Sequence, residues 1–217
     1  MNEEKLIKEF SKLSSPVISD IMDDLEITHN IINIRAIVPR KTICGRAVTV
    51  TAEPTNEKLS TGHIIEAIDK GKENDILFIN APNVKRGCVV GEILSTVAKR
   101  NKISGIIVNG GVRDIELIKE ISFPVYSRYV SNEGPMGRIT TTGYQNPIKI
   151  GDVNMKPNDI IFADDDGIVV IPQEKAELIL RKSKGYMETE ELVKKKIVDG
   201  KPLADAAKLI GEYRKYS

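Results

Sequence analysis

The sequence of 217 residues predicts an α/β protein with a partly parallel sheet, and three observations lead to this fold class. Residues 75–130 alternate short apolar runs with amphipathic runs, which is typical of buried strands separated by helices. Residues 147–172 hold short apolar segments between turn residues, and residues 173–217 have a charged helical pattern. Because parallel strands need crossover connections, we expect right-handed strand–helix–strand units. The length favours a single domain over residues 1–217, with 173–217 as its helical C-terminal tail.

The alternating region defines three strands and two helices. Strands are predicted at DILFINA (75–81), ISGIIVNGG (103–111) and FPVYSRYV (123–130). Helices are predicted between them at GEILSTVAKRNK (91–102) and IELIKEI (115–121). One face of the first helix is predicted to carry the apolar residues Ile93, Leu94, Val97 and Ala98. The apolar residues of the second helix are Ile115, Leu117, Ile118 and Ile121.

The flanking segments predict further elements. Residues 4–13 form a helix with Leu6, Ile7, Phe10 and Leu13 on one face. A second helix begins at Ser15–Pro16, with Ser15 as the cap and Pro16 at the first helical position. Residues 43–54 alternate enough to form a strand, and residues 56–75 form a polar loop followed by a helix over Ile64, Ile65, Ala67 and Ile68.

The C-terminal third predicts two different arrangements. From residue 147 onward, short strands either form a second sheet or extend the first sheet in antiparallel fashion. Residues 199–202 (Asp-Gly-Lys-Pro) break the helical tail in two.

Composition excludes several classes of protein. Lys and Arg number 32 and Asp and Glu number 31, so the net charge is +1 and no basic surplus indicates nucleic acid binding. No apolar run approaches the ~18 residues that a membrane span requires. Cys44 and Cys88 form no CxxC motif, and His29 and His63 are far apart in the sequence, so a zinc cage is not expected. We expect a cytoplasmic protein whose cysteines are small core residues.

Residues 91–94 offer a first candidate binding element. A helix start leaves backbone N–H groups without intrahelical partners, and the helix dipole favours anions there. Gly91 would let a ligand approach the backbone closely, so the amides of Gly91, Glu92, Ile93 and Leu94 could cradle a carboxylate. An ordinary loop-to-helix junction explains the same pattern, and taken alone it is the better interpretation.

Arg113 and Asp114 offer a second candidate, directly after a predicted strand. Ligands of open α/β sheets collect at the carboxyl ends of strands. Asp114 could simply cap the helix at 115–121, but capping does not require Arg113. A guanidinium can hold a keto-acid oxygen or a carboxylate with a forked contact, and a carboxylate can hold Mg²⁺. Gly110 and Gly111 would keep this junction uncrowded.

Other motifs favour ordinary structural roles. The Asp164–Gly167 stretch lacks the spacing of a calcium loop and predicts a tight turn between strands. Cys88 has no evident base beside it in the sequence, so a buried structural role is favoured. His63 is a lone histidine at a helix start, and such a residue usually has a structural role. Lys85 and Arg86 are interpreted by default as an exposed pair in a loop.

The stretch GEILSTVAKRNKISGIIVNGGVRDIELIKEISFPVY (91–126) resembles the core of the RraA-like family. SSPVISDIMDDL, GRAVTV and PNDIIFADDDGIVVIP resemble its N-terminal helix, first core strand and closing strands, so the resemblance covers roughly residues 10 to 205. That family includes metal-dependent 4-hydroxy-4-methyl-2-oxoglutarate aldolases, which also decarboxylate oxaloacetate. It also includes regulators of ribonuclease E activity.

The resemblance implies a layered α/β/β, swivelling-domain-like fold and a homo-oligomer, either a trimer or a hexamer made of two trimers. It implies that the backbone of Gly91 to Leu94 holds the substrate carboxylate and that Arg113 binds the keto oxygen and steadies the enolate. Asp114 would hold the divalent cation, Mg²⁺ or Mn²⁺, and Glu92 would orient a water on it. Glu190 or Glu191 would be the C-terminal acidic residue that reaches a neighbouring subunit's site.

Three departures from the family pattern stand out. Asn109 replaces an acidic residue before the Gly-Gly step, which would weaken the outer shell of the metal site. Asn158 replaces a glycine in a Pro-Gly-Asp turn, and asparagine tolerates the left-handed backbone such a turn needs. The tail does not reproduce the pattern of the characterised aldolases, so the aldol substrate stays open.

Two functions of different classes follow. The first is a divalent-metal-dependent lyase that cleaves 4-hydroxy-2-oxo diacids as a class II aldolase, or decarboxylates oxaloacetate to pyruvate. The second is a non-catalytic regulator that binds a ribonuclease or helicase. The combination of Gly91–Leu94 with Arg113–Asp114 exceeds what a binding scaffold needs, so the enzyme ranks first. Direct RNA binding ranks third because the charge is balanced.

Overall fold

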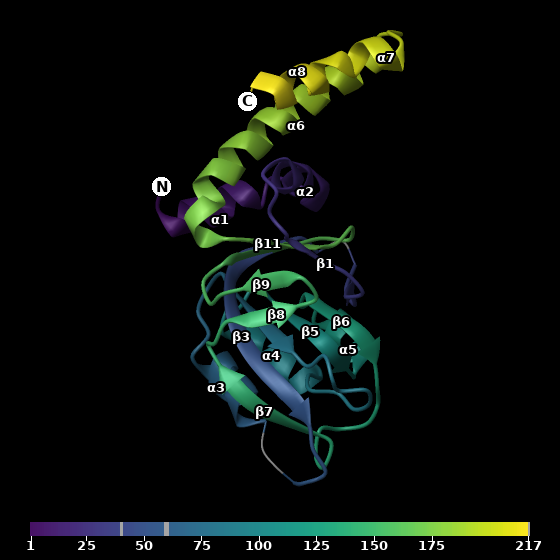
Figure 1. Cartoon of the computed structure of the whole chain (residues 1–217). Coiled ribbons are helices and arrows are strands. Elements are labelled where there is room, and N and C mark those ends of the chain that lie inside the picture. Colours follow the sequence, from purple (N-terminus) through teal and green to yellow (C-terminus); the bar gives the residue numbers. More distant parts are fainter. Residues whose placement is uncertain (40, 59–60, 217) are drawn as a thin grey trace.

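The computed structural model describes residues 1–39, 41–58 and 61–216, and its centre is a mixed β-sheet (Figure 1). The order of its main path is β1-β11-β10-β3-β4-β5-β6-β2, and β7 pairs with β3 beside this path. Residues 59–60 of the predicted polar loop and Ser217 of the predicted tail lie outside the described residues.

The parallel core follows the predicted alternation closely. β3 (Ile43–Pro54), β4 (Asp75–Asn80), β5 (Gly105–Val112) and β6 (Val125–Val130) pair in parallel in this order. α3 (Gly62–Asp69), α4 (Glu92–Arg100) and α5 (Ile115–Glu120) connect them. The register places Asn80 opposite Asn109 and Ile107 opposite Tyr126. Because the strands run in parallel, their carboxyl ends meet at one edge of the sheet.

Both arrangements predicted for the C-terminal third occur. β10 (Ile160–Ala163) and β11 (Ile168–Ile171) extend the main sheet in antiparallel fashion from β3. β8 (Ile148–Ile150) and β9 (Val153–Met155) form a separate two-stranded sheet. The sheet is completed by β7 (Ile139–Tyr144) and by the short strands β1 (Asn30–Ile31) and β2 (Arg35–Ala36).

Three apolar clusters organise the layers. The first lies between the parallel strands and α3, α4 and α5, and includes Ile68, Ile79, Ala98 and Ile118. The second lies on the opposite face of the sheet. It includes Phe78 and Ile107 of the sheet together with Ile150 and Met155 of the β8–β9 hairpin. These clusters produce the helix–sheet–sheet layering that the α/β/β expectation described.

The third cluster joins both ends of the chain. α1 (Glu3–Phe10), α2 (Ser15–Asp24) and α6 (Ala176–Val198) bury apolar residues against β10 and β11. After a 3₁₀ turn (Gln173–Lys175), the predicted tail is helical, and it breaks after Val198 before α7 (Leu203–Ala206) and α8 (Lys208–Tyr216). α8 folds back on α6, so these helices form an arm that rises from the body (Figure 1).

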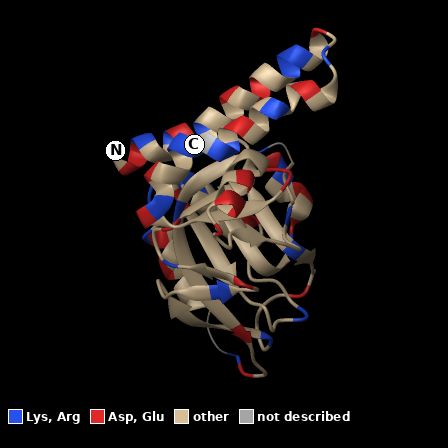
Figure 2. Cartoon of the chain, turned by 45° about the horizontal axis from the view of Figure 1, so that its top comes forward, with Lys and Arg blue, Asp and Glu red and all other residues tan. Residues whose placement is uncertain are grey.

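Charges on the arm are mixed in sign. Figure 2 shows Lys and Arg interspersed with Asp and Glu along its helices. Among the described residues, no helix combines the length and the apolar composition that crossing a membrane requires.

The apolar face predicted for the helix at 91–102 is only partly correct. Ile93 on α4 is 72% exposed, and Leu117 among the apolar residues of α5 is 47% exposed. In α4 the buried positions are Ser95 and Ala98, and the Ser95 hydroxyl donates to the carbonyl of Gly91 at 2.9 Å. Ile93 lies two residues before Ser95, which is ~200° around a helix with 3.6 residues per turn, so its side chain faces away from the sheet.

The predicted cap of α2 is shifted by one residue. Ser14 occupies the cap position, and Ser15 is buried inside the first turn. The amide and hydroxyl of Ser15 donate to the carboxylate of Asp164 at 2.8 and 2.6 Å. The same carboxylate accepts the amides of Asp166 and Gly167, so it also shapes the predicted tight turn between β10 and β11. A distant side chain therefore caps the helix start, which local sequence patterns do not reveal.

We expect Asp164→Ala to lower the free energy of unfolding by about 2 kcal/mol, because it leaves the start of α2 and the β10–β11 turn without their shared acceptor. Urea unfolding followed by circular dichroism measures the change. Asp166→Ala is the matched control, since the Asp166 contact to Asp164 is made by its backbone amide. Equal stability of the two variants would contradict the capping role.

Candidate functional site

Five of the predicted site residues meet at the edge of the sheet where the parallel strands end. A cavity of about 210 Å³ lies there, and its lining includes Gly91, Ile93, Leu94, Arg113 and Asp114. Ligand pockets usually span ~300–1,000 Å³, so this cavity suits a small ligand. Other cavities are larger, up to 730 Å³, but they do not contain the Arg113–Asp114 pair.

Asp114 reaches across from the start of α5 to the start of α4. Its backbone is left-handed, with φ of 58°, and its side chain makes no capping bond to α5. Its Oδ2 instead accepts the backbone N–H of Glu92 at 3.2 Å. The alternative that Asp114 simply caps its own helix is therefore wrong. Aspartate is one of the residue types that tolerate this conformation.

Gly91 makes this approach feasible. A Cβ atom at position 91 would lie 2.4 Å from Asp114 Oδ2 and 3.3 Å from Arg113 Nε. The φ of Gly91 is −142°, which any residue can adopt, so space rather than backbone freedom requires glycine here. The two helix starts thus converge, as the sequence predicted.

Arg113 faces the same cavity. Its Nε lies 3.4 Å from Asp114 Oδ2, and its backbone amide donates to the carbonyl of Val90 at 3.0 Å. The side chains of Arg113 and Asp114 are 42% and 37% exposed, so both can contact a ligand. An incoming anion would meet a guanidinium and the positive end of α4 together.

The glycines before Arg113 have different roles. A Cβ on Gly111 would lie 2.2 Å from the carbonyl oxygen of Gly87 and 2.6 Å from the ring of Tyr129. A Cβ on Gly110 would lie 3.3 Å from Ala81 Cβ, which is tight but not prohibitive. Gly111 is therefore the position that lets the chain before α4 lie against β5.

The amide cradle predicted at the start of α4 is partly occupied. The Glu92 amide donates to Asp114, while the amides of Ile93 and Leu94 belong to the first turn, which has no intrahelical acceptors. The Glu92 carboxylate accepts the Thr96 hydroxyl at 2.7 Å, along its own helix, and the cavity lining does not include Glu92. Its role toward a metal-bound water stays a prediction.

The donor set around Asp114 fits a cation that keeps most of its own water. Within the described ranges, no three His, Cys, Asp or Glu side chains converge as a metal cage. Asp114 offers one carboxylate, and Mg²⁺ is commonly held by one or two carboxylates together with waters and substrate oxygens. Asp114 is therefore the residue of this cavity that would hold a divalent cation.

The departures from the family pattern have structural explanations. Asn109 is buried and donates to Asn80 Oδ1 at 2.8 Å, and Asn80 in turn donates to the carbonyl of Lys149 in β8. It therefore lies toward the β8–β9 face, and the cavity beside Asp114 does not include it. Asn158 has a φ of 72°, which confirms the left-handed turn.

Glu190 and Glu191 lie on α6 in the arm, and the cavity lining of this chain does not include them. Glu191 pairs with Lys194 at 2.8 Å. Their predicted role at a neighbouring subunit's site stays a prediction.

The cavity also contains residues that the sequence did not single out as ligands. Thr61, Cys88 and Pro135 also line the cavity. Cys88 is 2% exposed, and burial raises the pKa of its thiol, which agrees with the predicted structural role. Pro135 follows β6, and only the parallel order of the strands brings it beside Arg113.

Two curated proteins are similar to this chain over most of its length. Protein DlpA of Legionella pneumophila is 32% identical over 203 residues, which cover 93% of this chain but only about a third (33%) of that relative. A protein of Halalkalibacterium halodurans named "Putative 4-hydroxy-4-methyl-2-oxoglutarate aldolase" is 28% identical and covers 89% of each chain.

A solved structure shows the same fold. Streptomyces coelicolor RraAS2, described as an unusual member of the RNase ES inhibitor RraA protein family, matches with a TM-score of 0.84. The match is 23% identical in sequence and covers 90% of this chain and 100% of that one. The sequence model of the RraA-like family, described as Aldolase/RraA, matches residues 15–170, and the chain belongs to this family.

Proposed function

We propose that this protein is a divalent-metal-dependent lyase that cleaves 4-hydroxy-2-oxo diacids and decarboxylates oxaloacetate to pyruvate. The observation that carries the proposal is the convergence of Arg113, Asp114 and the start of α4 on one small cavity. The aldolase name of a relative that is 28% identical supports the reaction class.

Each group has one task in the proposed reaction. The amides of Ile93 and Leu94 bind the substrate's 1-carboxylate at the positive end of α4. Asp114 would hold the cation, which supplies Lewis acidity at the 2-keto oxygen when bound. Arg113 places a second positive charge beside that oxygen, where negative charge develops as the C3–C4 bond breaks.

The electron balance is the same for both substrates. The C3–C4 bonding pair stays with C3 and becomes part of the pyruvate enolate. An aldol substrate must also give its 4-hydroxyl proton to a nearby carboxylate that acts as base; its remaining part then departs as a carbonyl compound, and the enolate is protonated at C3. Oxaloacetate loses CO₂, and only protonation of the enolate at C3 remains. Decarboxylation therefore requires less of the protein, and we expect it whichever aldol substrate is used.

A regulator that binds a ribonuclease is the alternative. The RraAS2 likeness is 23% identical and therefore shows the fold alone. A protein without metal-dependent turnover that captures a ribonuclease in a pull-down would reverse the ranking.

We expect purified protein to release pyruvate from oxaloacetate in the presence of Mg²⁺ or Mn²⁺ and to lose this activity in EDTA. A lactate dehydrogenase assay for pyruvate measures the rate, and a protein-free blank with the same metal corrects for spontaneous decarboxylation. Turnover that persists unchanged in EDTA would contradict the role of the cation. A panel of branched 4-hydroxy-2-oxo diacids in the same assay would then identify the aldol substrate.

We expect Arg113→Ala to lower kcat for oxaloacetate about 100-fold, equivalent to ~3 kcal/mol, because one positive charge at the enolate oxygen is lost. Arg100→Ala, at the far end of α4, is the matched control and should keep the wild-type rate. Full turnover of the Arg113 variant would remove this residue from the mechanism.

We expect Gly91→Ala to fold normally but to lose activity at least ~10-fold, because its Cβ displaces the Asp114 carboxylate from the start of α4. Gly211→Ala on α8 is the control, since a Cβ there meets nothing within 4 Å. The rate of pyruvate release and the melting temperature are measured for both. Wild-type activity of Gly91→Ala would show that the close approach is not needed.

A further inference from the structure

Residues 131–138 connect β6 to β7, and we call them the wall segment. Pro135 of this segment lines the cavity. A Cβ on the preceding Gly134 would lie 3.4 Å from Arg113 Nη1, so the backbone of the segment lies close to the guanidinium. The position of the wall segment therefore decides how much of Arg113 is open to solvent.

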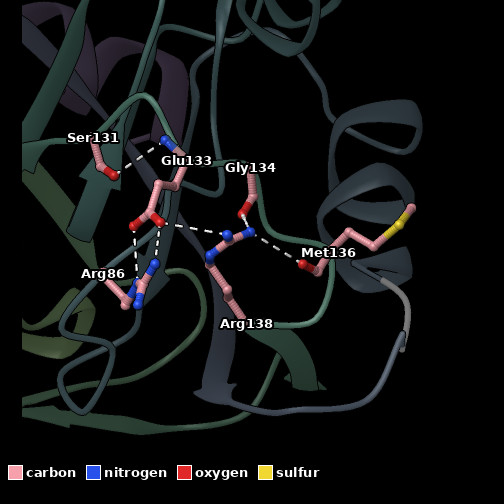
Figure 3. A network of polar contacts seen from close by, with 6 residues as sticks. All are labelled: Arg86, Ser131, Glu133, Gly134, Met136 and Arg138. Carbon is pink, nitrogen blue, oxygen red and sulfur yellow. Dashed lines mark hydrogen bonds and ion pairs between the residues drawn. The ribbon is translucent and has the colours of Figure 1, made fainter.

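Glu133 attaches the wall segment to the chain before α4 (Figure 3). Its Oε2 accepts Arg86 Nε at 3.0 Å, and its Oε1 accepts the Nη2 group of the same guanidinium. Its backbone carbonyl accepts the amide of Cys88 at 2.9 Å. The side chain and the backbone of Glu133 thus hold one strip, residues 86–88, that borders the cavity.

Arg138 closes the other end of the segment. Its Nη2 lies 3.4 Å from Glu133 Oε1, and its Nη1 donates to the carbonyls of Gly134 and Met136, each at 3.3 Å. These carbonyls lie on either side of Pro135, so the guanidinium ties the turn around that residue to Glu133 (Figure 3).

Global stability does not explain this cluster. The side chains of Glu133, Arg138 and Arg86 are 30%, 35% and 70% exposed, and ion pairs at such positions contribute little to folding. What the contacts have in common is the segment they hold. The hydrogen bond from Arg86 lowers the pKa of the Glu133 carboxyl, so the bridging group is ionised at neutral pH.

We propose that Glu133 is a positioning residue: bridging Arg86 and Arg138, it keeps the wall segment closed over the cavity and so controls ligand access to Arg113. The effect on turnover rests on the proposed lyase function. The effect on access to the cavity is independent of that function. Cys88 can report access, because its buried thiol lines the cavity and its backbone amide donates to the carbonyl of Glu133.

Alkylation of the two cysteines by iodoacetamide tests access directly. Peptide mass spectrometry of the labelled protein separates Cys88 from Cys44, which is buried in the cluster formed by α1, α2 and α6 and serves as the internal control. We expect Glu133→Gln to raise the Cys88 labelling rate at least ~3-fold while Cys44 stays unchanged. Glu116→Gln, which removes another surface ion pair, is the matched control and should change neither rate.

An unchanged Cys88 rate would overturn the proposal, and so would a parallel rise at both cysteines, which reports general loosening. Arg138→Gln is a second variant, and it should raise the Cys88 rate in the same way. The labelling result does not depend on whether the wild-type protein turns over oxaloacetate.

Steady-state kinetics test the link to the lyase. We expect Glu133→Gln to raise KM for oxaloacetate about fivefold with kcat within about twofold, since an open wall weakens binding more than chemistry. An equal loss in kcat with unchanged KM would overturn the positioning role. Absence of turnover in the wild type would instead reject the proposed function.

Discussion

The close approach of Asp114 to the start of α4 is the contact on which the site depends. A carboxylate from one helix start accepts the first amide of another, and a glycine between them leaves the required space. This contact sets Arg113 beside the positive end of α4, at the small cavity where we propose that an anionic substrate binds. The Glu92 amide that donates to Asp114 is not available to a ligand. The carboxylate of Asp114 therefore lies at the helix start beside which we propose that the substrate carboxylate binds.

Much of the fold could be predicted because the parallel core is periodic. Strands buried on both faces read as continuous apolar runs, and β4, β5 and β6 were found within a few residues of their ends. The short strands β1 and β2 were not predicted, because two residues are too few to show a hydrophobic periodicity. The cap of α2 was misplaced by one residue because its acceptor, Asp164, lies 149 residues away in the chain.

Some features of the candidate site could likewise be predicted from the sequence, and others could not. Arg113 and Asp114 follow β5 directly, and Gly91 precedes the helix that comes after β4, so their meeting at one edge could be inferred from element order. The left-handed backbone of Asp114, which turns its carboxylate toward α4, could not. Glu133 and Pro135 lie in a connection whose path depends on the packed sheet, and the only signal in the sequence is a cluster of turn residues there.

Three successive parallel strands lead into the groups around the cavity. The register of those strands therefore sets the distances between these groups. β4 leads to Gly91, β5 to Arg113 and β6 to the wall segment, with Asn80 level with Asn109. Sliding one strand by a single residue would shift its loop by ~3.3 Å and turn its buried side chains to the wrong face. The apolar filling on both sides of the sheet forbids that slip, so the interior of the protein, far from any ligand, sets the spacing that a bound acid would experience.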